Sequence, residues 1–299
     1  MLVGGAGQAA GDVVGGKSGA GEIDPGEIGR IEAHGARIPA LGFGTWQLRG
    51  RPCVDAVKAA LDIGYRHVDT ARMYGNEREV GEGIRASGVK RDDIFLTTKV
   101  WRDDIASGAL ERSAEASLRD LDLGPADLLL IHWPNAAIPL RGSIAALCNA
   151  RKRGLARHIG VSNFPSAMLE EAIALSTEPL VANQCEYHPR LDQSAVIAAC
   201  RRHGLAFVSY SPLGRGDLMK DAAIGAIARR LGRTASQVVL RWHVQQQGVA
   251  AIPRSGTPSH IAENFAISDF TLSGDDMKAI SSLASAKGRL VDMGWVRWD

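Results

Sequence analysis

Short apolar runs alternate with longer amphipathic segments along most of this chain, from Ile31 to the C-terminus. Each run is only a few residues long and apolar through most of its length, which is typical of buried strands in a parallel sheet covered by helices. The pattern predicts eight strands, at residues 41–45, 67–70, 94–99, 128–132, 158–161, 181–184, 206–210 and 249–252.

The segments between these runs place apolar residues three and four positions apart, as in 54–61 and 110–121. That spacing puts the apolar side chains on one face of a helix. Glycine commonly ends a helix, and Gly64 and Gly124 follow these two stretches. A helix is therefore expected after each strand, with those glycines as the first and third helix ends.

Eight strand–helix units in one chain of this length predict a closed (β/α)₈ barrel, a TIM barrel, over residues 31–299. A doubly wound open sheet is the alternative, but its glycine fingerprint is missing from 42–46, where the first βα turn is expected. A β-hairpin turning at Gly35 should precede the barrel. Two extra helices, at 224–231 and 274–283, exceed the eight-unit count.

Residues 1–30 differ from the rest, because ten of them are glycine and none is aromatic. Such a segment has little apolar surface to offset the entropy lost on ordering, so it is expected to be a flexible tail. Residues 11–18 match the phosphate-loop pattern GxxxxGK[ST], and 5–10 loosely match a dinucleotide fingerprint. Both motifs need a buried strand before them and a helix after them, which this sequence does not provide.

The composition narrows the class of protein. There are 35 Lys+Arg and 33 Asp+Glu residues, and the net charge of +2 gives no reason to expect a nucleic-acid partner. The four cysteines show no metal-binding spacing, so neither a metal site nor a disulfide framework is expected. No apolar run is long enough for a membrane helix, and a cytoplasmic enzyme, expected to be a monomer, fits best.

Reactive side chains stand at the ends of three consecutive apolar runs: Asp69, Lys99 and His132. In a barrel the C-terminal ends of the strands form the active-site face, so the three should meet there. Tyr74 follows Asp69 closely enough to reach the same space. Individually, Asp69 and Lys99 could form a structural ion pair and His132 could be a core residue; together they suit acid–base catalysis.

Hydride reduction of a carbonyl needs a proton donor for the developing alkoxide, and Tyr74 can be that donor. An ammonium at about 4 Å and an effective dielectric near 20 supplies on the order of 4 kcal/mol. We therefore expect Lys99 to shift the pKa of Tyr74 by a few units toward neutrality, with Asp69 holding Lys99 charged. His132 would donate a hydrogen bond to the carbonyl oxygen.

These segments resemble the aldo-keto reductase superfamily from about Ile31 to the C-terminus. The resemblance is carried by 42–46 (GFGTW), 68–77 (VDTARMYGNE), 98–101 (TKVW), 130–134 (LIHWP), 159–164 (IGVSNF), 210–214 (YSPLG), 251–255 (AIPRS) and 261–264 (IAEN). It implies NADPH-dependent carbonyl reduction on a (β/α)₈ barrel, with the catalytic tetrad Asp69, Tyr74, Lys99 and His132.

The resemblance also implies where the cofactor is bound. The nicotinamide carboxamide would be held by Ser162, Asn163 and Gln184, and the ring would stack on Tyr210. The other implied cofactor contacts are Thr45, Ser211 and Leu213 along the pyrophosphate, Arg254 and Ser255 at the 2′-phosphate, His260 beside them, and Glu263 and Asn264 at the adenine, with no part of the cofactor assigned to Thr45. Many relatives carry arginine at the position of His260, whereas Arg254 suits a phosphate well, so NADPH preference is expected.

Trp46, Trp101 and Trp133 follow or end three strands and are expected to form the wall of the substrate pocket. The loop after the seventh strand and the tail after Leu283 are short, which predicts an open mouth suited to small dicarbonyls and aldehydes. The ending resembles bacterial 2,5-diketo-D-gluconate reductases of the B type, which also reduce methylglyoxal. Two other functions remain open: a nucleotide-sensing binding module on the same barrel, and a nucleotide hydrolase that uses 11–18.

Overall fold

The computed structural model describes residues 28–285 and 287–299. Its strands are β1 (Arg30–Ala33), β2 (Ala36–Pro39), β3 (Phe43–Gly44), β4 (His67–Asp69), β5 (Phe95–Val100), β6 (Ala126–Ile131), β7 (Ala156–Ser162), β8 (Leu180–Glu186), β9 (Ala206–Tyr210) and β10 (Val249–Ala251). Its α-helices are α1 (Gly50–Ile63), α2 (Glu77–Ser87), α3 (Ala109–Leu121), α4 (Leu140–Lys152), α5 (Ser166–Leu175), α6 (Ser194–Arg202), α7 (Ala222–Leu231), α8 (Ala235–Val244), α9 (Pro258–Phe265) and α10 (Gly274–Ser281). Four 3₁₀ segments complete the set: η1 (Arg72–Tyr74), η2 (Arg91–Asp93), η3 (Arg102–Asp104) and η4 (Gly214–Lys220).

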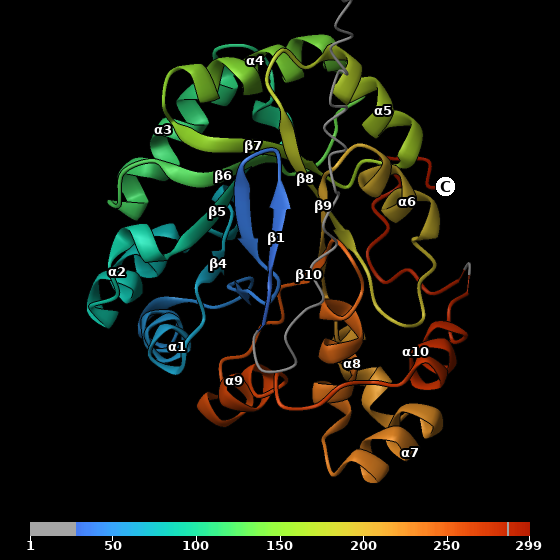
Figure 1. Ribbon diagram of the computed structural model, residues 1–299. Coiled ribbons are helices and arrows are strands. Elements are labelled where there is room, and N and C mark those ends of the chain that lie inside the picture. The colour runs from blue at the N-terminus through green and yellow to red at the C-terminus, as the bar shows by residue number, and fades with distance from the viewer. Residues whose placement is uncertain (1–27, 286) are drawn as a thin grey trace, which may run out of the picture.

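Strands β3 to β10 form one parallel sheet in which every neighbour in space is also the neighbour in sequence. The first and last strands are joined around Leu41 and Ala251: the Ala251 amide donates to the Ala40 carbonyl at 2.8 Å, and the Gly42 amide donates to the Ala251 carbonyl at 2.9 Å. The sheet is therefore closed, with helices outside it (Figure 1). The (β/α)₈ barrel is confirmed, and the doubly wound sheet is wrong.

Hydrophobic side chains pack in two layers, one inside the barrel and one between the sheet and the helices. The antiparallel hairpin β1–β2 lies across one end of the strand ring (Figure 1) and buries Ala33, Ala36 and Ile38 against the barrel interior. It turns at His34 and Gly35, both in the left-handed region of the backbone, as the glycine there predicted. The hairpin thus closes this end, and the site must lie at the other.

Most element boundaries differ from the sequence prediction by one or two residues, and two of the differences have a clear local cause. Only Phe43 and Gly44 pair as a strand, so β3 is shorter than 41–45, because residue 41 makes a single bridge across the barrel seam. Helix α3 ends at Leu121 rather than at Gly124, because Asp122 already takes the left-handed conformation (φ 52°) and its amide donates to the Leu118 carbonyl. Aspartate tolerates that conformation better than most residues do.

The two extra helices are α7 and α10, where the sequence predicted them. In the described part of the chain we find no helix with the length and apolar character needed to cross a bilayer. The glycine-rich matches at 5–10 and 11–18, and residues 1–27 of the tail predicted over 1–30, lie outside the described residues. The end of that tail prediction is wrong, because Arg30 already pairs with Pro39 in the hairpin.

Candidate active site

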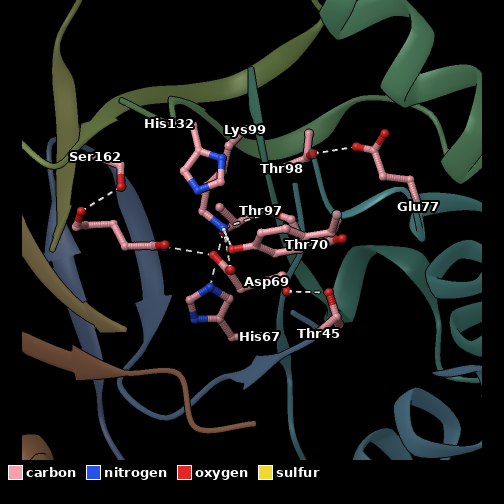
Figure 2. A network of polar contacts seen from close by, with 12 residues as sticks. Thr45, His67, Asp69, Thr70, Glu77, Thr97, Thr98, Lys99, His132 and Ser162 are labelled. Atoms are coloured by element: carbon pink, nitrogen blue, oxygen red, sulfur yellow. Dashed lines mark hydrogen bonds and ion pairs between the residues drawn. The ribbon is translucent and has the colours of Figure 1, made fainter. Parts of the chain in front are cut away.

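The four residues predicted to act together meet at the end of the barrel opposite the hairpin. Asp69 is the last residue of β4, Lys99 lies near the end of β5, and His132 directly follows β6. Parallel strands end at the same edge of a sheet, so these side chains converge (Figure 2). Tyr74 reaches them from the 3₁₀ turn η1, which follows β4.

The Lys99 ammonium has no solvent exposure, and each of its three protons has an acceptor. Its Nζ lies 2.5 Å from Asp69 Oδ1, 2.9 Å from the Thr70 carbonyl oxygen and 3.4 Å from Tyr74 Oη. The second oxygen of Asp69 accepts from Gln184 Nε2 at 2.8 Å. Burial pushes the pKa of Lys99 down, but Asp69 and Tyr74 outweigh it, so the pKa of Lys99 is raised and the ammonium is kept.

The direction of the Tyr74 pKa shift differs from the sequence prediction. Burial raises the pKa of this hydroxyl, and Lys99 opposes the rise only in part, so the net shift is upward rather than toward neutrality. The sequence argument counted the ammonium and omitted the loss of hydration on burial, which penalises the phenolate. The phenol therefore holds its proton at neutral pH, as a general acid must before the reaction begins.

His132 is a neutral imidazole in this site. Burial, together with the charge of Lys99, places its pKa well below the usual value. Its Nδ1 is buried and has no hydrogen-bond partner in the described part of the chain. A neutral imidazole carries one proton, and a buried unpaired N–H is costly, so the proton belongs on Nε2. The imidazole can then donate one hydrogen bond to an oxygen in the cavity.

A buried polar network fixes the turn that carries Tyr74. Thr98, next to Lys99, donates to the Glu77 carboxylate at 2.6 Å, and Arg72 of η1 donates to the other Glu77 oxygen at 3.2 Å (Figure 2 shows the first contact). Glu77 is only 2 % exposed. Sequence reasoning missed this link, although an acidic residue predicted to be buried at a helix start would have been a signal for it.

Four residues expected at the nicotinamide form a connected set at the ends of β7, β8 and β9. Tyr210 Oη donates to Asn163 Oδ1 at 2.8 Å, and Asn163 Nδ2 donates to the His132 carbonyl at 2.9 Å. Ser162 Oγ donates to the Gln184 carbonyl at 2.7 Å. Asn163 has a left-handed backbone (φ 64°). Such conformations cluster at functional sites, where the surrounding fold holds them in place.

The other expected cofactor residues divide into two groups. Thr45, Ser211 and Arg254 line the cavity together with Asp69, Tyr74 and His132, and Ser211 also has a left-handed backbone (φ 50°). Five do not line it: Leu213, which packs into the hydrophobic core; Ser255, which accepts from the Thr257 amide; and His260, Glu263 and Asn264 on α9. Apart from Leu213, the residues of this second group follow Arg254 along the chain, and all five lie outside the cavity itself.

The cavity has a volume of about 340 Å³ and opens at the mouth of the barrel. Trp46, Trp101 and Trp133, the tryptophans expected at the substrate pocket, line this cavity, and the Trp101 ring meets the His132 ring edge-on at 5.3 Å. Sequence reasoning missed several other lining residues: Met73, Arg215, Ile252, Val291 and Met293.

The C-terminal residues correct the expectation of an open mouth. Val291 and Met293 form part of the cavity wall. Trp295 packs edge-on against Trp101 and Trp133, with ring centroids 5.8 and 5.6 Å apart. The tail is short, but it crosses the mouth. Two tryptophans within its last residues, in a chain with only 5% aromatic residues, were the signal that it packs against the protein.

The charge at the mouth fits an anionic cofactor. Arg254 donates to the Trp46 carbonyl at 2.9 Å and to Gln47 Oε1 at 2.8 Å, and Arg215 lies 5.7 Å from the Trp46 ring. Neither guanidinium forms an ion pair with a carboxylate within residues 28–285 or 287–299. Two uncompensated cations beside the tetrad suit phosphate groups.

Comparison with known proteins identifies the family. The family model described as the aldo/keto reductase family matches residues 40–285. The methylglyoxal reductase DkgB of Escherichia coli O157:H7 is 38% identical over 249 residues, which are 82% of this chain and 93% of that protein.

Solved structures agree with this match. A protein assigned as a 2,5-diketo-D-gluconic acid reductase B has a TM-score of 0.90 and 45% identity, over 92% of this chain and 99% of that one. A mutant of Gox0644 in complex with NADPH has a TM-score of 0.83 and 38% identity, over 89% and 97% of the two chains. With its closed barrel and this extent of similarity, the chain belongs to the aldo/keto reductase family, and it is an NADP(H)-dependent oxidoreductase.

Proposed function

We propose that this protein reduces small aldehydes and ketones to alcohols with NADPH, and that Tyr74 is the general acid. The observation that carries the proposal is the Lys99 ammonium, which is fully buried, paired with Asp69 and 3.4 Å from the Tyr74 hydroxyl. A buried charge is costly unless it is paired, and here the pair lies against a phenol that lines a cavity.

The residues divide the chemistry among them. Bound NADPH supplies the hydride. Tyr74 Oη gives its proton to the carbonyl oxygen as negative charge develops there, and the phenolate left behind is stabilised by the Lys99 ammonium. His132 donates its single N–H to the same oxygen and orients the carbonyl. Asp69 keeps Lys99 charged and in place through the 2.5 Å contact.

For the cofactor, we propose the residues that the family resemblance implied. Ser162, Asn163 and Gln184 would hold the nicotinamide, with Tyr210 against its ring, and Thr45 would also contact the cofactor. Ser211 and Leu213 would follow the pyrophosphate, Arg254, Ser255 and His260 would surround the 2′-phosphate, and Glu263 and Asn264 would contact the adenine. The uncompensated charge of Arg254 and the position of Ser255 to Asn264 directly after it in the chain support this order.

We propose small dicarbonyls and aldehydes, such as methylglyoxal or 2,5-diketo-D-gluconate, as substrates. The names of two similar proteins, a methylglyoxal reductase and a 2,5-diketo-D-gluconic acid reductase B, support this class. The cavity of about 340 Å³, narrowed by Val291 and Met293, favours a small substrate beside the nicotinamide.

The test is a substrate screen of the purified full chain with NADPH. We expect the absorbance of the reduced nicotinamide to fall with methylglyoxal, 2,5-diketo-D-gluconate or simple aldehydes, and alcohol to accumulate in equal amount. NADPH binding without turnover on any of these carbonyls would favour the alternative of a nucleotide-sensing module. Size-exclusion chromatography alongside would test the expected monomer.

Arg254→Met should raise the KM for NADPH far more than the KM for NADH. The guanidinium would contact only the 2′-phosphate, which NADH lacks, and a hydrogen bond to a charged group is worth about 1.5–3 kcal/mol, or roughly 10- to 150-fold. Initial rates with both cofactors at one saturating carbonyl concentration measure the effect. Equal changes for the two cofactors would contradict the role of Arg254.

The pH profile of reduction should be flat through neutrality and fall only on the alkaline side. Reduction needs the protonated phenol, and burial places the pKa of Tyr74 above its usual value of about 10. His132, whose pKa is well below its usual value, adds no step between about pH 5 and 8. Measuring kcat/KM against pH with a nonionisable aldehyde tests this, and a descending limb centred near pH 7 would refute it.

A further inference from the structure

A second buried carboxylate stands at the barrel mouth, and the proposed chemistry does not use it. Glu186 is the last residue of β8 and has no solvent exposure. Its Oε1 accepts from the Leu290 amide at 2.7 Å, and its Oε2 accepts from the Val291 amide at 2.9 Å. His188 Nε2 lies 3.1 Å from Oε1. Both carboxylate oxygens are therefore occupied by main-chain donors of the C-terminal residues.

The chain reaches Glu186 along a path that leaves little freedom. A few residues before Leu290, the Ser285 amide donates to the Arg190 carbonyl at 3.1 Å. Gly288 then passes the same carbonyl so closely that an added Cβ would lie 1.7 Å from the oxygen. Residues 287–299, hereafter the C-terminal segment, are thus fixed at its start by backbone packing and at Leu290 and Val291 by the Glu186 carboxylate.

The part of the segment beyond Glu186 builds the cavity wall. Val291 and Met293 line the cavity directly. Trp295 lies between the rings of Trp101 and Trp133, and the Arg102 guanidinium is 3.9 Å from the Trp295 ring centroid. Leu290 and Met293 are 39 % and 48 % exposed, so the burial of these two side chains does not by itself fix the wall. The segment is held by Glu186 near its start and, at its far end, by the Asp299 carboxylate, which accepts from the Ser166 amide at 2.9 Å.

We propose that Glu186 is a positioning residue that sets substrate selectivity by holding the C-terminal segment against the cavity. Hydrogen bonds from amides to a carboxylate are roughly twice as strong as neutral ones, and this one side chain receives two from consecutive residues. With the segment held, a substrate large enough to reach Val291 or Trp295 finds a preformed wall; without it, that wall must be ordered on binding. The proposal rests on the proposed reductase function.

The test compares Glu186→Gln with the unaltered protein on two substrates of one chemical class, methylglyoxal and the larger phenylglyoxal. Glutamine has nearly the same shape, but it presents an N–H₂ group to one of the two amides and loses the charge. We expect the KM for phenylglyoxal to rise about tenfold, as removal of one charged hydrogen bond predicts. The KM for methylglyoxal, the kcat values and the dissociation constant of NADPH should change less than about twofold.

Glu186→Asp keeps the charge, so its KM for phenylglyoxal should lie between that of the unaltered protein and that of Glu186→Gln. Trp295→Ala removes part of the wall itself. In a double-mutant cycle, adding Glu186→Gln to Trp295→Ala should raise the KM for phenylglyoxal little further if the carboxylate acts through the C-terminal segment. An additive effect, or a change confined to NADPH affinity, would overturn the proposal and indicate instead that Glu186 acts on Tyr210, its partner in the β8–β9 pairing.

A readout independent of activity separates this proposal from the proposed function. Trypsin cuts after arginine, and Arg289 flanks the held residues. Limited proteolysis of the NADPH-loaded protein, followed by mass spectrometry, should release the C-terminal peptide faster from Glu186→Gln than from the unaltered chain. Equal rates of release from the two proteins would show that Glu186 does not hold the C-terminal segment, even if the enzyme is active. If Glu186→Gln releases the peptide faster but the unaltered protein reduces no carbonyl, Glu186 holds the segment and the proposed reductase function is wrong. If Glu186→Gln fails to fold, the kinetic comparison and the limited proteolysis are both made with Glu186→Asp.

Discussion

Replacing Tyr74 by phenylalanine is expected to lower kcat for carbonyl reduction by about a hundredfold to ten-thousandfold, the range for a positioned general acid. The variant loses one oxygen, and that oxygen is the group that faces both Lys99, at 3.4 Å, and the cavity. Water entering the space would be a poor substitute because it is not positioned by the fold. Single-turnover rates with bound NADPH measure the loss without interference from product release.

The control for Tyr74→Phe is cofactor affinity. Tyr74 is not among the residues proposed to bind NADPH, so the dissociation constant, measured by quenching of tryptophan fluorescence, should stay within about twofold. The residual activity should also lack the alkaline limb of the pH profile, since no phenol is left to titrate. A variant with kcat near that of the unaltered enzyme would show that another group donates the proton.

Replacing Lys99 by methionine is expected to damage both activity and stability. Asp69 would remain buried without its cation, and breaking a buried ion pair from one side costs about 3–5 kcal/mol of the free energy of unfolding. Activity should fall as well, because the phenolate formed when Tyr74 gives up its proton would lose its nearest positive charge. Urea denaturation measures the stability, and single-turnover kinetics measure the chemistry.

The double variant Asp69→Asn with Lys99→Met separates the two effects. Asparagine is neutral, so most of the lost stability should return, while the activity stays low because the ammonium is still absent. Recovery of activity together with stability would mean that Lys99 only supports the fold. A single Lys99→Met variant as stable as the unaltered protein would contradict the buried pair seen at 2.5 Å.

Much of the barrel follows from local sequence. The apolar runs fall within or next to all eight strands of the sheet, because a strand buried on both faces must be apolar over most of its length. Helix α1 ends at Gly64 as predicted, since glycine takes the positive φ of that cap without strain. Helix α3 does not end at its glycine, because Asp122 reaches the left-handed conformation first.

The meeting of Asp69, Lys99 and His132 could also be predicted, because each ends an apolar run and parallel strands end at one edge. The turn that brings Tyr74 to them could not be predicted in the same way. It depends on the contacts of Glu77 with Thr98 and Arg72, which come from three different elements. Contacts of this kind are set by packing between elements, which no local pattern encodes.

By itself, the sequence determined the order of strands and helices and the side chains at the strand ends, because both depend on the period and polarity of neighbouring residues. Only the tertiary structure decided the sign of the Tyr74 pKa shift and the wall formed by Val291 and Met293. The first depends on how completely surrounding atoms remove water from the phenol, and the second on the Glu186 carboxylate more than a hundred residues earlier in the chain. Hydration and long-range contacts are properties of the folded molecule.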